Sequence, residues 1–193
     1  MTLIVDIPTW RPSWVRVVPA FSVLEKLMGD LENEGAGQLR LLARERGDIE
    51  VLSALLQDAI ILVEDMVFER ESKRFIIVAN RFCWDLSPVE GVTTQTGGPV
   101  FQRRLCGVQF AAVKRVRQTG LPVDRRSGFL NLLAITTPDL DSDTDPALLI
   151  DLLFSGGASV RLEMDEIHVQ VEDIDAPQPT GNQPVHEITD KES

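Results

Sequence analysis

Two histidines, His168 and His186, are the only imidazoles of the sequence, and the chain contains no tyrosine. On a helix, His168 would lie beside Asp165 and Glu172, at spacings of three and four residues. Metal sites generally take three or more ligands from a fixed scaffold, and a solvated helix face explains the same residues. We therefore predict no metal site and no catalytic residues, so acid–base chemistry would have to rest on carboxylates, Cys or Lys.

The remaining patterns typical of cofactor sites also fail. The aspartates that begin at Asp139 resemble a calcium loop, but the sixth position is Thr144 and the twelfth is Ile150, where an EF-hand needs Gly and Glu. The glycine pairs at 97–98 and 156–157 lack the spacing and the following Lys of a nucleotide-binding loop. We expect an acidic solvated loop over 139–146 and no cofactor.

Asn80 and Arg81 interrupt an otherwise apolar segment. Burying a guanidinium is costly unless it is paired. One interpretation places Arg81 near a strand end in an internal ion pair with Asp58 or Asp85. The other places Asn80 and Arg81 at the floor of a pocket for an anionic ligand, with Trp84 as an aromatic wall or simply as part of the core.

The net charge of −11 contains a marked asymmetry. Residues 101–128 hold seven Lys or Arg and one Asp, whereas residues 139–193 hold fourteen acidic and two basic residues. Either the two regions neutralise each other or solvate separate faces, or the basic stretch binds an anionic partner. Nucleic acid is an unfavoured partner, because few aromatic residues interleave the basic ones and the whole chain is acidic. The candidate contact residues in this stretch are Arg103, Arg104, Lys114, Arg115 and Arg117.

The composition favours a cytoplasmic location. No apolar run approaches the roughly 18–20 residues that cross a bilayer, and prolines and tryptophans interrupt any signal-peptide pattern at the N-terminus. The two cysteines, Cys83 and Cys106, form no CxxC motif, so we expect buried free thiols and not a disulfide or a zinc site.

The elements that must position these residues follow from hydrophobic periodicity. Residues 48–58 predict an amphipathic helix with Asp48 as its N-cap. Residues 74–84 carry apolar side chains on both faces and predict a central strand. Residues 105–117 and 129–136 are also strand-like, and Gly156-Gly157 is typical of a hairpin turn. Further strand-like segments are 39–42, 60–63, 66–69, 147–154 and 159–163.

The C-terminal part of the domain is ambiguous. Residues 164–174 fit both a helical stripe and strand alternation, and we expect a helix, because it could cap an open sheet. The whole order predicts an α+β fold with a mainly antiparallel sheet of six to seven strands, an early helix and a C-terminal helix. A bent sheet or small barrel of pleckstrin-homology type would suit this order.

Composition divides the chain into a poorly ordered extension at 1–38, one α+β domain at 39–175 and a disordered polar tail at 176–193. Two start positions remain open. The sequence fits a translation start at Met1 and equally a start at Met28, and the second would make residues 1–27 an annotation artefact.

Several short segments resemble an uncharacterised alphaproteobacterial family, one of the domains of unknown function. The matching segments are Leu-Gln-Asp-Ala (56–59), Asn-Arg-Phe-Cys-Trp-Asp (80–85), Leu-Leu-Ala-Ile (132–135) and Phe-Ser-Gly-Gly-Ala-Ser-Val-Arg-Leu (154–162). The resemblance covers about residues 39–174 and implies a gene neighbourhood that often includes histidinol dehydrogenase. It implies no catalytic residues.

The sequence leaves the function unknown, and we expect a non-enzymatic binding or accessory protein with an unknown protein partner or a small anionic ligand. One alternative is a small enzyme or factor that supports amino-acid (histidine) metabolism. Another is a nucleic-acid binder that uses the basic stretch over residues 103–126.

Overall fold

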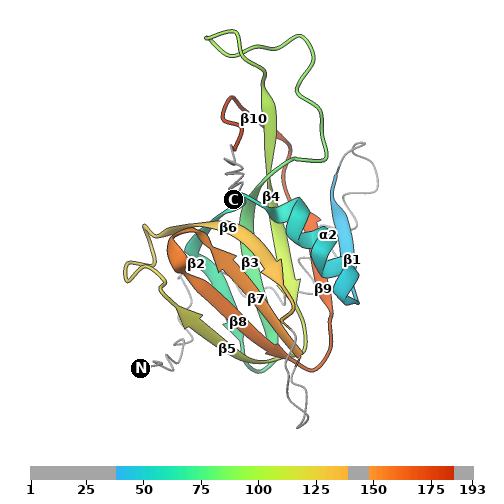
Figure 1. Ribbon diagram of the computed structural model, residues 1–193, viewed down its shortest axis with the longest axis vertical. Coiled ribbons are helices and arrows are strands. Elements are labelled where there is room, and N and C mark those ends of the chain that lie inside the picture. The colour runs from blue at the N-terminus through green and yellow to red at the C-terminus, as the bar shows by residue number, and fades with distance from the viewer. Residues whose placement is uncertain (1–37, 139–147, 185–193) are drawn as a thin grey trace, which may run out of the picture.

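The computed structural model describes residues 38–138 and 148–184 (Figure 1). Residues 1–37 of the predicted extension (1–38), the predicted acidic loop (139–146) and residues 185–193 of the predicted tail therefore lie outside the described residues. The elements are β1 (Arg40–Ala43), α2 (Arg46–Leu56), β2 (Ile60–Glu69), β3 (Arg74–Phe82), β4 (Phe101–Phe110), β5 (Val113–Thr119), β6 (Phe129–Thr136), β7 (Leu148–Phe154), η1 (Ser155–Gly157), β8 (Ser159–Met164), β9 (Val169–Asp173) and β10 (Gln178–Thr180).

The predicted α+β fold with six to seven strands and two helices is wrong. The described residues form a ten-stranded antiparallel sheet with one α-helix and a short 3₁₀ turn. The strand order is β1-β9-β4-β3-β2-β6-β7-β8-β5, and β10 pairs with β4. The sheet bends between β2 and β6, so that β6, β7, β8 and β5 lie across β2, β3 and β4 (Figure 1). The inward side chains of both layers join in one hydrophobic core.

The predicted C-terminal helix over 164–174 is a turn followed by β9. Val169, Val171 and Asp173 point inward and are buried, while Gln170 between them is less buried. The segment forms a strand because β9 pairs with β4 on one side and with β1 on the other. This position buries Val169 and Val171 in the core, and both neighbouring strands satisfy the backbone groups of β9. Position in the sheet, and not the local pattern, decides the element.

The early helix is present, but its start differs from the prediction. Helix α2 begins at Arg46, with Glu45 as the N-cap. Asp48 occupies the third helical position, and its carboxylate accepts the backbone N–H groups of Arg44 at 2.7 Å and Glu45 at 3.1 Å. The helix packs Leu52 against the core, and it lies beside β1 and β6 (Figure 1).

The segment predicted as one strand over 105–117 contains two strands in different layers. The chain leaves β4 after Phe110 and turns at Ala112, which has a φ of 58°. This left-handed conformation is uncommon for a residue with a side chain. It lets β5 pair with β8 instead of continuing beside β3, and so places the two halves of the basic stretch in different layers.

The loop between β5 and β6 closes tightly around Gly128. A Cβ atom at this position would lie 2.7 Å from the Cβ of Pro122 and 2.8 Å from the carbonyl oxygen of Asp124. The carbonyl of Gly128 accepts the N–H of Val63 at 2.9 Å. Only glycine therefore fits at the point where this loop joins β2.

The single α-helix of the described residues is too short to span a membrane.

Candidate anion-binding site

Arg81 lies in the core and has no contact with solvent. Its Nε donates to Asp173 Oδ1 at 2.7 Å and its Nη2 donates to Asp173 Oδ2 at 2.8 Å, with both side chains 0% exposed. Its Nη1 donates to Asp85 Oδ1 at 2.7 Å. The predicted ion pair with Asp85 is confirmed, and the principal partner, Asp173, comes from a strand that the sequence did not predict. A fully buried guanidinium that is paired in this way cannot reach a ligand.

The network around Asp173 joins four strands at one end of the sheet. Its Oδ2 also accepts the N–H of Leu39 at 2.8 Å, and Arg104 Nη1 lies 3.7 Å away. Burial lowers the pKa of Arg81, but the hydrogen bonds from its guanidinium to Asp173 and Asp85 outweigh burial and raise the pKa. The group stays charged at every physiological pH, so its role is to hold β1, β3, β4 and β9 together.

Both cysteine thiols are free and buried close to this network. Burial raises the pKa of Cys106 to about 12, with a further contribution from the charge of Asp173. Burial also raises the pKa of Cys83. Since the thiolate is the nucleophile and the metal ligand, neither thiol is arranged for catalysis.

Trp84 and Arg103 both pack against the ring of Phe82. The Trp84 Nε1 donates to the carbonyl oxygen of Gln57 at 3.0 Å, and its ring lies 4.4 Å from the ring of Phe82. On the other side, the Arg103 guanidinium lies 5.7 Å from the same Phe82 ring, a distance typical of a cation–π contact. Its Nη1 donates to the backbone carbonyl of Asn80 at 2.8 Å.

Asn80 points to the outer face of the sheet, opposite to Arg81. The register places it between Ile60 on β2 and Leu105 on β4, and Ile174 follows next to Leu105. These three apolar neighbours are 39%, 38% and 40% exposed. Asn80 is therefore half-buried within an apolar row across the sheet, and its Oδ1 is buried with no hydrogen-bond partner among the described residues. Asn80 and Arg81 lie on opposite faces, so they do not form the floor of one pocket together.

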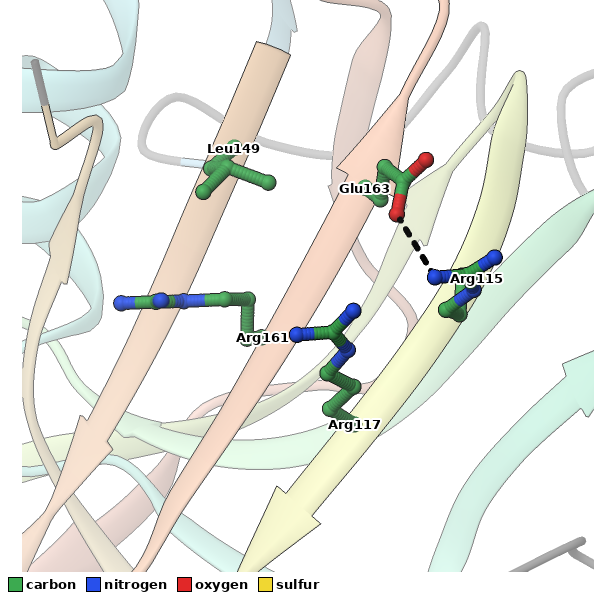
Figure 2. A pocket seen from close by; sticks show the side chains of 5 residues that line it. All are labelled: Arg115, Arg117, Leu149, Arg161 and Glu163. Atoms are coloured by element: carbon green, nitrogen blue, oxygen red, sulfur yellow. Dashed lines mark ion pairs between the residues drawn. The ribbon is translucent and has the colours of Figure 1, made fainter. Parts of the chain in front are cut away.

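Two of the predicted residues, Arg115 and Arg117, lie beside a hollow on the opposite layer. Arg115 and Arg117 project from β5, Arg161 and Glu163 from β8, and Leu149 from β7, around a volume of about 180 Å³ (Figure 2). The strand register places Arg117 directly opposite Arg161, and Arg115 opposite Glu163. We call Arg115, Arg117 and Arg161 the arginine cluster.

Two members of the arginine cluster have carboxylate partners. Arg161 donates from Nε and Nη2 to the two oxygens of Asp151, both at 2.6 Å. Hydrogen bonding to Asp151 raises the pKa of Arg161. Arg115 Nη1 lies 3.7 Å from Glu163 Oε2, beyond normal hydrogen-bond distance. The cluster is thus partly neutralised at its two ends.

Arg117 differs from the other two arginines. No carboxylate of the described residues pairs with it. Its side chain leans from β5 over β8, between Arg161 and Glu163 (Figure 2). A guanidinium carries five N–H donors in a planar fork that matches carboxylate and phosphate oxygens. The hollow therefore presents unused donors and positive charge to solvent.

The rest of the basic stretch lies elsewhere. Lys114 Nζ lies 2.6 Å from Asp165 Oδ1, and this hydrogen bond lowers the pKa of the aspartate. Arg104 points into the core near Asp173, and Arg103 caps Phe82. The described residues thus divide the stretch between two layers, and acidic residues from the C-terminal half neutralise part of it.

Sequence reasoning found Arg115 and Arg117 but missed Arg161, Glu163 and Asp151. A usable signal was present, because Arg161 and Glu163 alternate with buried Val160, Leu162 and Met164. That alternation predicts that the two charged residues share the outer face of a strand. The sequence does not show that β5 lies beside these residues, because β5 and β8 are far apart in the chain.

The described residues contain no group of three or more His, Cys, Asp or Glu arranged to hold a metal ion. His168, in the segment whose secondary structure was ambiguous from the sequence, precedes β9. Its backbone carbonyl accepts the N–H of Ala111 at 2.9 Å.

Comparison with known proteins gives one match. A family model described as "protein of unknown function (DUF2948)" matches residues 39–186. No curated protein and no solved structure matches the chain.

Proposed function

The chain belongs to the DUF2948 family of proteins of unknown function, and from this premise we propose that it is a non-enzymatic binding or accessory protein. Its arginine cluster would hold an oxyanion group, a carboxylate or a phosphate, of the bound molecule. The observation that carries the proposal is Arg117, which faces Arg161 across two paired strands and has no carboxylate partner among the described residues.

Like charges directly opposite each other destabilise a sheet by roughly 0.2–1 kcal/mol. Asp151 offsets this repulsion for Arg161, but no described carboxylate offsets it for Arg117. An anion in the hollow would contact both guanidinium groups and remove the repulsion. Because the cluster is open to solvent, a small free anion should bind weakly, with a Kd on the order of millimolar, near −4 kcal/mol.

The other features of the described residues support binding over catalysis. The strongest buried charges, Arg81 and Asp173, satisfy each other and are closed to solvent. The exposed apolar row that includes Leu105 and Ile174 favours a protein as the bound molecule. A continuous basic face would favour nucleic acid, and the division of the basic stretch between two layers supports a more local contact.

Titration of nitrogen-15-labelled protein with inorganic phosphate, and separately with citrate, tests the proposal. We expect saturable shifts of the Nε–H signals of Arg117 and Arg161, which weaken as salt rises. The Arg117→Gln variant should lose them. The matched control is Arg44→Gln, which removes an exposed arginine from the turn before α2. Equal, non-saturating shifts at Arg44 and Arg117 would refute a specific site.

Three wider expectations belong to this proposal. We propose a cytoplasmic location and an alphaproteobacterial origin. The resemblance implies a gene neighbourhood near histidinol dehydrogenase, and such a neighbourhood would favour the alternative of a factor in histidine metabolism. Deletion of the gene tests that alternative, because it predicts slow growth that added histidine restores.

A further inference from the structure

Strand β5 forms one end of the sheet. It pairs with β8 and with no other strand of the described residues, and it lies at the rim of the front layer (Figure 1). In a strand, alternate backbone N–H and C=O groups point to each side. The N–H of Val113, at the start of β5, donates to the carbonyl oxygen of Lys73 at 2.8 Å. Beyond Val113, one side of β5 presents a row of backbone groups that no described strand covers, and such a row is a template for another strand.

The side chains of β5 limit which strand could pair there. Lys114, Arg115 and Arg117 are exposed, while Val113 is buried and Val116 is partly buried. Basic side chains on an edge strand discourage pairing with apolar strands. They also oppose a second copy of β5, because cationic residues would then lie close together across the new pair.

An acidic strand meets the opposite situation. Side chains two residues apart lie on one face of a strand, roughly 6.6 Å apart, which is the relation between Arg115 and Arg117. In the free protein both side chains lean toward β8 (Figure 2). An added strand with carboxylates at alternate positions would place the carboxylates as cross-strand neighbours of Arg115 and Arg117, within reach of these long side chains once they turn toward it. The charges that exclude other strands would then select this one.

The other end of the sheet lacks these features. Strand β1 has four residues, Arg40–Ala43, and its only charged side chain is that of Arg40. Strand β5 has seven residues, and the hollow lined by the arginine cluster lies directly beside it. Length and charge therefore both distinguish β5 as the edge for pairing.

We propose that β5 binds an acidic, extended peptide segment of a partner protein as an additional strand. Backbone hydrogen bonds to the free side of β5 beyond Val113 hold the segment, and carboxylates at its alternate positions contact Arg115 and Arg117. This inference rests on the proposed function, because it identifies the bound oxyanions as acidic side chains of a peptide strand.

A synthetic peptide with the sequence Thr-Glu-Val-Glu-Val-Glu-Thr, with both ends blocked and a fluorophore attached, tests the inference by anisotropy with the full chain. In an added strand, the backbone N–H groups of the peptide point alternately toward β5 and toward solvent. One analogue is therefore N-methylated at every N–H of the first set, and a second analogue at every N–H of the other set. Methylation of the set that faces β5 removes backbone donors and should weaken binding by about tenfold or more. Methylation of the solvent-facing set should change binding by less than about threefold and controls for peptide conformation.

On the protein side, Arg117→Gln should weaken the parent peptide, and Arg44→Gln should not. Amide hydrogen exchange at alternate residues of β5 should slow when the peptide binds. If both methylated analogues bind as well as the parent, the strand-pairing inference is overturned while the anion site stands. If phosphate and citrate bind the arginine cluster but no peptide binds, the strand-pairing inference fails and the proposed anion site stands. If neither small anions nor peptides bind, both proposals fail.

Discussion

Replacing Arg81 with Met is the most informative perturbation of the core. Methionine keeps an unbranched apolar stem and removes the guanidinium. The change leaves the Asp173 carboxylate, which is 0% exposed, without the two hydrogen bonds of 2.7 and 2.8 Å that neutralise it. The N–H of Leu39 and the more distant Arg104 remain as partners, but they replace only part of the lost charge pairing.

Breaking a buried pair by removing one partner costs about 3–5 kcal/mol. This is a large part of the roughly 5–15 kcal/mol by which most domains are stable. With a urea m-value of about 2 kcal/mol per molar, the unfolding midpoint should fall by about 1.5–2.5 M. Equilibrium urea unfolding of wild type and Arg81→Met, followed by circular dichroism, measures this shift.

The matched control is Arg74→Met on the same strand. Arg74 makes a similar two-point contact with Glu69, at 3.1 and 2.8 Å, but both side chains are partly exposed. Such pairs contribute about 0–1 kcal/mol. If Arg81→Met loses no more stability than Arg74→Met, burial does not govern the strength of the Arg81 network, and the reasoning is refuted.

Three further predictions concern other parts of the fold. Both buried thiols should resist thiol reagents in the native protein at pH 8, because burial raises their pKa, to about 12 for Cys106; rapid labelling without unfolding would contradict this. Lys114→Met should raise the pKa of Asp165, because the hydrogen bond from Lys114 lowers this pKa in the wild-type protein. A carboxyl group with a lowered pKa stabilises the fold above about pH 4, and this stabilisation is lost as the pH falls, so the variant should lose less stability below about pH 4. Carbon-13 NMR of the Asp165 carboxyl group measures the change in its pKa. Gly128→Ala should lower stability by about 1–3 kcal/mol through steric overlap, whereas Gly47→Ala, with open space around it, should not lower the melting temperature.

Local patterns predicted the elements whose partners lie nearby in the chain. The apolar run at 74–84 gave the central strand β3, and the Gly156-Gly157 signal gave the hairpin of β7 and β8. Both glycines have positive φ angles, 76° and 81°, which glycine adopts without strain. Such signals work because the residues that carry them also determine the local geometry.

Elements decided by distant partners could not be predicted. The segment at 164–174 fits a helix by spacing, but β9 is fixed between β1 and β4, whose residues lie far away in the sequence. The same holds for the principal partner of Arg81, since Asp173 is 92 residues away. An arginine in an apolar segment predicts that a carboxylate pairs with it in the core, but only the strand order of the folded protein determines which carboxylate this is.

The arginines at positions 81 and 117 show how one residue type separates into two roles. Arg81 has Asp173 and Asp85 around it at hydrogen-bond distance, so its charge is used within the fold. On the outer face of β5 and β8, Arg115 lies opposite Glu163, as expected for a sheet stabilised by cross-strand pairs of opposite charge. The next row places Arg117 opposite Arg161. Arg161 is already paired with Asp151, but a carboxylate at position 117 would stabilise the free protein better than Arg117 does. This row therefore makes physical sense if a bound molecule supplies the negative charge that no described carboxylate supplies to Arg117.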